Sequence, residues 1–253
     1  MKKMPSKIPT RALRRAYVLM LARFGHQHWW PGETPFEICI GAILTQNTSW
    51  TNVERAIANL KSAGALEPRK MFALPEAELA RLIRPAGYFN VKARRLRAFL
   101  RVLVEEFDAD LQKLFADETA KVRGRLLAIN GIGPETADSM LLYAGGHHSF
   151  VIDAYTKRIF QRHRWPGLLA MREPFKVQGS KFKVQRSRPN SFSYDALKSL
   201  CESVLNQKRG AARVDYWQDY HAQLVMVGKH HCRSRNPRCD ECPLKPLLPK
   251  SDT

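Results

Sequence analysis

Apolar residues recur at spacings of three and four along most of this chain, which is the pattern of amphipathic helices. Signals for strands are scarce, and short stretches containing Gly or Pro separate one periodic segment from the next. The pattern is clearest in five segments: Val53–Lys61, Ala77–Ile83, Lys92–Glu106, Ala120–Leu127 and Thr136–Tyr143. Short helices joined by short connections predict an all-α fold.

The charge of the chain favours a polyanionic partner. The 253 residues include 42 Lys and Arg but 23 Asp and Glu, which gives a formal net charge of +19. So large an excess favours nucleic acid as the partner, with a membrane surface second. No apolar run approaches the roughly 20 residues of a membrane span, and the sequence predicts no signal peptide. We expect a monomeric cytoplasmic protein, associated with the nucleoid if its source is bacterial.

Two stretches lack helical periodicity. Residues 164–192 are basic and contain a near-repeat, in which Phe175–Lys181 is followed by Phe182–Arg188. A plain surface insertion and a loop that touches DNA both explain this stretch. The polar segment Asn206–Arg213 is predicted to be a second loop.

The segment Leu126–Asp138 reads LLAINGIGPETAD and predicts a tight turn between two helices. The second helix should begin at Pro134, because proline is favoured at the first helical position. Free amides at such a helix start can hold a phosphate. If only Gly131 and Gly133 were considered, an ordinary corner between two helices would explain them. The full pattern favours a DNA-binding helix-hairpin-helix at about residues 123–143.

This hairpin, followed by Phe150–Asp153 and Tyr155–Phe160, resembles the endonuclease III superfamily of helix-hairpin-helix DNA glycosylases. In that family an aspartate follows the hairpin, and Asp153 lies twenty residues past Gly133. The resemblance covers nearly the whole chain outside residues 164–192. It implies two helical domains with a DNA-binding cleft between them. The central domain would span residues 34–146, and residues 1–33 with 147–253 would form the second.

The resemblance makes Asp153 the catalytic residue of an enzyme that removes damaged bases from double-stranded DNA. Breaking the bond between base and sugar builds positive charge on the sugar, and a fixed anion beside it stabilises that charge. Asp153 also precedes a predicted helix, Ala154–Arg162, so it can cap that helix as well. The two roles are compatible.

One hairpin position predicts how the bond is broken. Relatives that also cut the DNA backbone use a lysine two residues after the second hairpin glycine, and this chain has Glu135 there. A glutamate cannot form the imine that such a lysine forms with the sugar. We therefore expect a monofunctional glycosylase that works through water.

The segments Trp29-Trp30-Pro31 and Gly41–Thr48 are similar to the type III 3-methyladenine DNA glycosylase branch. This resemblance implies that Trp29 and Trp50 hold the flipped base, with Trp30 and Pro31 beside them. A purine that carries positive charge after alkylation stacks well on an indole face. A plain core role for the tryptophans stays open.

The resemblance also implies which residues contact the duplex. Gln46 matches the position of a side chain that fills the gap left by the flipped base, although a capping role is open too. Residues that would contact the DNA backbone lie in the hairpin and on the basic helix that follows Gly87: Gly131, Ile132, Gly133, Glu135, Thr136, Lys92 and Arg94.

Three cysteines near the end of the chain, Cys232, Cys239 and Cys242, have the spacing of iron–sulfur ligands in this superfamily. The position of the fourth ligand is Leu248. A [4Fe–4S] cluster completed by another residue, no cofactor, and a zinc ion all remain open. His230, His231 and Cys201 are the candidates for the missing ligand.

Two rival functions also remain. One is a glycosylase for oxidised or mispaired bases with weak abasic-site lyase activity. The other is a protein that binds lesions in DNA without catalysis, although the presence of Asp153 argues against it.

Overall fold

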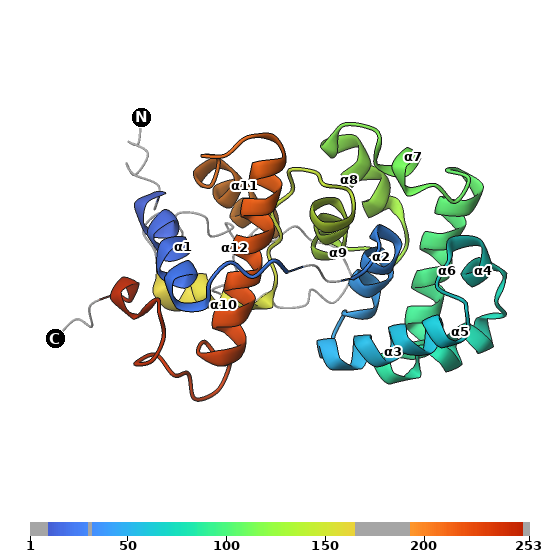
Figure 1. Cartoon of the computed structure of the whole chain (residues 1–253), viewed down its shortest axis with the longest axis horizontal. Helices are drawn as coiled ribbons and strands as arrows, with labels where there is room; N and C mark the ends of the chain where they lie inside the picture. The colour runs from blue at the N-terminus through green and yellow to red at the C-terminus, as the bar shows by residue number, and fades with distance from the viewer. Residues whose placement is uncertain (1–9, 30–31, 165–192, 250–253) are drawn as a thin grey trace, which may run out of the picture. The chain divides into compact units, whose positions relative to one another are not determined.

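The computed structural model describes residues 10–29, 32–164 and 193–249. Within these residues every regular element is a helix, which confirms the predicted all-α fold (Figure 1). Trp30, Pro31 and residues 165–192 of the predicted insertion lie outside the described residues. None of the helices in the described part of the chain is long and apolar enough to cross a membrane.

The chain divides into two compact units. Residues 29–151 form the first, which we call the central unit, and residues 1–28 with 152–253 form the second, the terminal unit. The described helices of the central unit are α2 (Pro35–Leu44), α3 (Trp50–Ser62), α4 (Pro68–Ala73), α5 (Glu76–Leu82), η1 (Arg84–Ala86), α6 (Phe89–Glu105), α7 (Leu111–Phe115), α8 (Thr119–Ala128), α9 (Pro134–Ser139) and η2 (Met140–Ala144).

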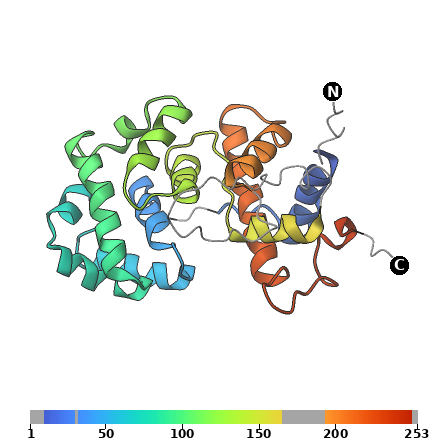
Figure 2. The same ribbon diagram turned by 180° about the vertical axis from the view of Figure 1, so that it is seen from behind.

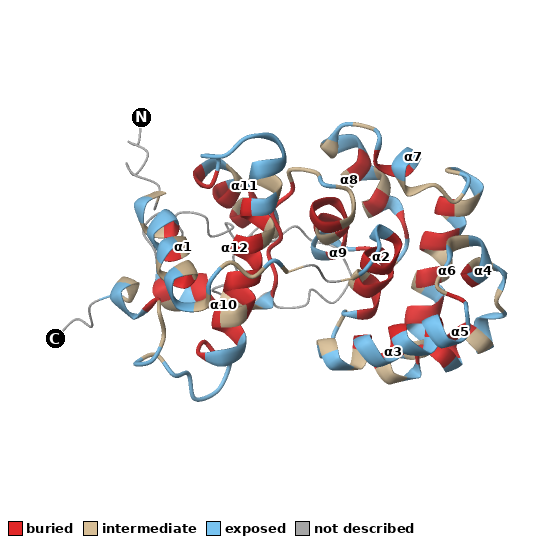
Figure 3. Ribbon diagram, viewed as in Figure 1, coloured by how far each residue is buried: buried red, intermediate tan, exposed pale blue. Residues whose placement is uncertain are grey.

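Helix α2 lies at the core of the central unit, because it is apolar on nearly all sides. It is buried along most of its length in Figure 3 and packs against α3, α6, α9 and η2. Its start is fixed by Thr34, whose hydroxyl accepts a hydrogen bond from the Glu37 amide at 3.1 Å. Four of the five periodic segments fall on one helix each to within one residue, and Thr136–Tyr143 runs from α9 into η2, so their predicted helical character is confirmed.

The described helices of the terminal unit are α1 (Thr10–Phe24), α10 (Ala154–His163), α11 (Tyr194–Val204), α12 (Gly210–His230) and the short η4 (Lys245–Leu247). Helix α12 lies beside α1 and α10 in both Figure 1 and Figure 2, and it packs against each. Its contact with α10 needs a glycine: a Cβ at Gly228 would lie 2.2 Å from Tyr155 Cδ1. This close packing sets α12 against the start of α10.

The predicted loop at Asn206–Arg213 is wrong in its second half, because α12 already begins at Gly210. The first turn of α12 consists of Gly210, two alanines and Arg213 and is largely exposed, so its sequence carries no stripe of large apolar residues. The guanidinium of Arg213 lies 6.0 Å from the ring centroid of Trp217, one turn further along the helix. This contact ties the first turn of α12 to the apolar part of the helix.

Candidate active site and nucleic-acid interface

The predicted hairpin is present in the central unit. Helix α8 ends at Ala128, α9 begins at Pro134, and the backbone of Gly131 has φ +89°. A Cβ at Gly131 would lie 2.2 Å from Cγ of Arg95, so the turn requires glycine for space as well as for conformation. Ile132 points into the core, whereas Gly133 and Pro134 are exposed. The hairpin therefore presents its glycine backbone and the start of α9 to solvent.

Gln46 joins the turn after α2 to this hairpin. Its amide nitrogen donates to the carbonyl of Gly131 and to the hydroxyl of Thr136, each at 3.0 Å. Its amide oxygen accepts a hydrogen bond from the guanidinium of Arg95. The hairpin, the proposed wedge residue and α6 thus form one hydrogen-bonded group. Arg95 was not among the predicted DNA contacts.

The prediction that Lys92 contacts DNA is wrong in this structure. Its side chain is 1% exposed, and its ammonium donates to the carbonyl of Leu44 at 2.8 Å and to that of Ala86 at 2.7 Å. Burial, with a smaller effect of Arg95, lowers the pKa of Lys92 to about 8. Lys92 therefore binds the ends of α2 and η1 together. Arg94, its neighbour in the sequence, is exposed.

Trp29 and Trp50 both belong to the central unit, and both are half-buried. The ring of Trp29 meets Tyr143 edge to face, with a centroid distance of 5.9 Å. The indole of Trp50 packs beside Gly41 on α2, where an added Cβ would lie 3.4 Å from it. Both tryptophans therefore pack against the central unit, while part of the surface of each stays open.

Asp153 opens α10 in the terminal unit and caps it. One carboxylate oxygen accepts from the Thr156 amide at 2.6 Å, and the other lies 3.7 Å from Nε2 of His221 on α12. Burial alone would raise the pKa of Asp153, but His221 and Thr156 lower it by more, so the net pKa lies below the ordinary value. The side chain is 13% exposed, and its carboxylate is held as an anion.

A second aspartate, which sequence reasoning missed, lies on α9. Asp138 is fully buried and binds Arg123 through two hydrogen bonds, of 2.9 and 3.2 Å. It also accepts a hydrogen bond of 2.6 Å from the hydroxyl of Ser149. This carboxylate joins α8, α9 and the segment that leads toward Asp153. Its position next to Ala137 in the hairpin motif was the only signal in the sequence.

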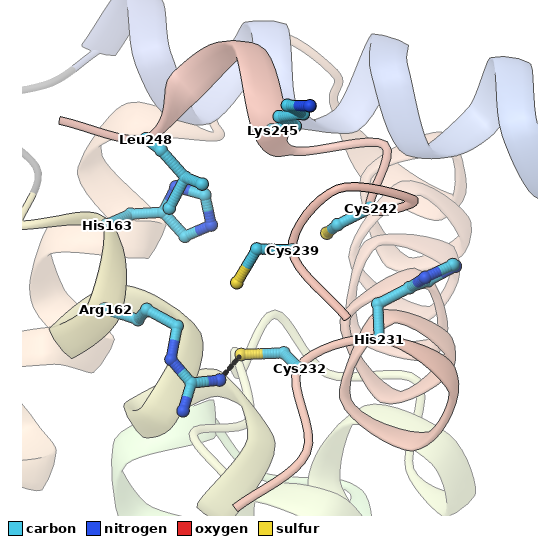
Figure 4. A pocket seen from close by; sticks show the side chains of 8 residues that line it. All are labelled: Arg162, His163, His231, Cys232, Cys239, Cys242, Lys245 and Leu248. Atoms are coloured by element: carbon cyan, nitrogen blue, oxygen red, sulfur yellow. Dashed lines mark hydrogen bonds between the residues drawn. The ribbon is translucent and has the colours of Figure 1, made fainter. Parts of the chain in front are cut away.

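The three cysteines line one pocket in the terminal unit (Figure 4). The pocket is partly open to solvent. Its other lining residues are Arg162, His163, His231, Lys245 and Leu248. Thiol groups converging on one pocket fit the donor chemistry of an iron–sulfur cluster, and Leu248 cannot supply a fourth thiolate.

Comparison with known proteins identifies the family. Residues 40–170 match the model of the HhH-GPD superfamily base excision DNA repair protein. The chain belongs to this superfamily. A putative DNA repair glycosylase of Methanocaldococcus jannaschii is 42% identical to this HhH-GPD protein over 91% of the chain and 93% of the relative. The resemblance drawn from the hairpin and Asp153 is thereby confirmed, and the protein is a DNA glycosylase of the base excision repair type.

Solved structures share the fold of this HhH-GPD protein. A non-covalent complex of endonuclease III with DNA has a TM-score of 0.71 at 20% identity, and the match covers 94% of each chain. The 3-methyladenine DNA glycosylase MagIII of H. pylori, bound to 1,N6-ethenoadenine, has a TM-score of 0.66 at 24% identity. That match covers 88% of this chain and 98% of the other.

Proposed function

We propose that this glycosylase hydrolyses the N-glycosidic bond of an alkylated purine of the 3-methyladenine type and leaves the DNA backbone intact. The state of Asp153 carries the proposal. A buried carboxylate that stays ionised is the group that an oxocarbenium-like transition state requires, because its charge acts in a site with little water. Its cap on α10 fixes one oxygen, and the other oxygen faces the imidazole of His221.

The choice of an alkylated purine rests on Trp29 and Trp50. Contacts within the central unit hold each indole in place, and part of the surface of each stays open. Alkylation puts positive charge on the purine, and base–aromatic stacking of this kind contributes roughly 1–3 kcal/mol per base. A cationic base is also a good leaving group, so the reaction needs no strong general acid.

Glu135 supports hydrolysis over lyase chemistry. The residue is exposed in the first turn of α9, at the position where lyases of this superfamily carry the lysine nucleophile. Without an amine there, water attacks the sugar, and Asp153 is the base that orients it. In this scheme the exposed glycine backbone of the hairpin and Arg94 bind phosphates of the damaged strand.

Gln46 is proposed as the side chain that enters the gap in the duplex. Its amide is bound to Gly131 and Thr136 in the absence of DNA, so entry into the duplex requires exchange of these hydrogen bonds for bonds to bases. Binding of DNA to the hairpin would therefore affect the position of Gln46.

A panel of duplexes with one lesion each tests the substrate. We expect release of 3-methyladenine, and no release of uracil, of thymine from mispairs or of oxidised pyrimidines. Preferential release of an oxidised or mispaired base would replace the alkylpurine proposal with the rival glycosylase. Failure to release any of these bases, with retained binding to the lesions, would favour a protein that senses damage.

Borohydride trapping on abasic-site DNA tests the hydrolytic mechanism. The wild-type protein should give no covalent adduct, because Glu135 stands where relatives with lyase activity carry the amine that forms the imine. The Glu135→Lys variant introduces that amine and should gain an adduct. A strong adduct with the wild-type protein would contradict the proposal, since another lysine would then be the nucleophile.

A further inference from the structure

A histidine from α10 shares the pocket of the three cysteines, and no motif in the sequence points to it. His163 is the last residue of α10, is 4% exposed and lies about 70 positions before Cys232. In Figure 4 its imidazole lies next to Leu248 and points into the space that the sulfur of Cys239 also faces. It therefore occupies the side of the pocket from which a fourth cysteine would reach inward.

We propose that His163 is the fourth ligand of a [4Fe–4S] cluster held by Cys232, Cys239 and Cys242. Imidazole replaces thiolate as an iron ligand in other iron–sulfur centres, so the donor chemistry fits. The proposal goes beyond base release, because it concerns the C-terminal segment of the terminal unit and no residue of the glycosylase reaction.

The spacing of the donors favours a cluster over a single ion. Among the described residues, no three His, Cys, Asp or Glu side chains come together as ligands of one metal ion. Zinc needs every thiolate within about 2.3 Å of one centre. A [4Fe–4S] cluster instead takes one ligand at each iron and so accommodates donors that are further apart.

The other candidates for the fourth ligand do not face the cysteines. The ring of His231 is directed away from the sulfur atoms in Figure 4. It lies instead 6.1 Å from the ring of Phe24, centroid to centroid. His230 is exposed and does not line the pocket, and Cys201 is buried in α11 away from it. His163 is the donor that remains among the described residues.

Neighbouring groups would hold the ligands in place. A hydrogen bond with the backbone of Leu247 orients His163, as second-sphere carbonyls orient histidine ligands in metal sites. The guanidinium of Arg162 donates to the sulfur of Cys232 at 2.9 Å, and Arg158 donates to the carbonyl of the same residue at 2.6 Å. These two contacts fix the position of Cys232 at the edge of the pocket.

Anaerobic reconstitution of the full-length chain tests the proposal without any DNA. We expect the wild-type protein to bind iron and acid-labile sulfide in equal amounts. Pulsed electron paramagnetic resonance of the reduced protein should detect a coupled nitrogen that changes when histidine is labelled with ¹⁵N. The His163→Cys variant should keep the cluster and lose this coupling. His231→Ala, which alters another histidine lining the pocket, should keep both cluster and coupling.

The His163→Ala variant should lose most of its iron, and a second substitution, Leu248→Cys, should restore it by supplying a thiolate on the same side. Restoration would also show that loss of iron does not come from misfolding. Three results would overturn the proposal: full iron content in His163→Ala, absence of nitrogen coupling in the wild type, or retention of zinc alone. None of them depends on whether the protein releases a damaged base.

Discussion

Asp138 and Asp153 are both buried carboxylates, one near the end of α9 and one at the start of α10, and their surroundings differ. Asp138 in the central unit is matched by the guanidinium of Arg123 in a two-bond ion pair and by the hydroxyl of Ser149. Asp153 in the terminal unit has a backbone amide and an imidazole as neighbours. A carboxylate whose charge is balanced by arginine stabilises the folded structure. A carboxylate held by weaker donors retains negative charge that can stabilise positive charge on a substrate.

The largest effect should come from Asp153→Asn. Asparagine caps helices as well as aspartate does, so folding should be retained. Without the charge, release of 3-methyladenine in single-turnover assays should fall roughly 10²- to 10³-fold. DNA affinity should change little, because the hairpin is untouched. Unchanged release would remove Asp153 from the reaction.

Asp138→Asn should lower the stability of the protein and leave base release nearly unchanged. It leaves the buried end of Arg123 without its counter-charge, which should lower the free energy of unfolding by about 3 kcal/mol in urea titrations. Per folded molecule, base release should stay near the wild-type rate. Glu78→Gln, which breaks the exposed ion pair with Arg81, is the control and should leave stability nearly unchanged. Equal stability of both variants would contradict the structural role of Asp138.

His221→Leu should change how the rate of base release depends on pH. The pKa of Asp153 in the folded protein lies below its ordinary value of 3.8, so the anion, and the stability that it contributes, are lost only as pH falls through that lowered pKa. Without His221, burial is opposed less and the pKa rises. The acidic limb of the single-turnover rate should therefore move to higher pH, with little change at neutral pH. His230→Leu, on the exposed side of the same helix, should not move it.

The smallest effects are expected for Lys92→Met and Arg94→Ala, which distinguish a structural role of Lys92 from a DNA-binding role of Arg94. Lys92→Met leaves the carbonyls of Leu44 and Ala86 without their donor and should cost about 1–3 kcal/mol of stability. Arg94→Ala should leave stability unchanged and reduce the slope of log affinity against log salt by about 1. A reduced slope for Lys92→Met would restore the prediction that Lys92 contacts DNA, and an unchanged slope for Arg94→Ala would remove Arg94 from the interface.

The sequence could predict the helices and the hairpin because local periodicity and turn chemistry decide them. Lys92 was misjudged because its charge was weighed above its position: it lies one turn before Leu96, on the buried face of α6. Gln46 was predicted to enter the duplex, but its bonds to the hairpin could not be predicted, because they join residues 85 and 90 positions apart.

His221 and His163 could not have been found from the sequence. Each meets its partners through packing between helices that are distant in the chain, and neither lies in a motif. The start of α12 was missed for a different reason, since its first turn has no large apolar residue that would reveal the helical period. Local patterns therefore predict elements and motifs well, whereas long-range partners require the structure.

Binding of two sugar analogues tests the central claim, that the charge of Asp153 acts on the sugar. One duplex carries a pyrrolidine ring that is positively charged where the oxocarbenium charge develops, and the other carries an uncharged tetrahydrofuran ring. The wild type and Asp138→Asn should bind the cationic analogue more tightly, as enzymes bind mimics of their transition states. Asp153→Asn should bind both alike. Equal affinities in the wild type, or a preference that survives in Asp153→Asn, would contradict the account.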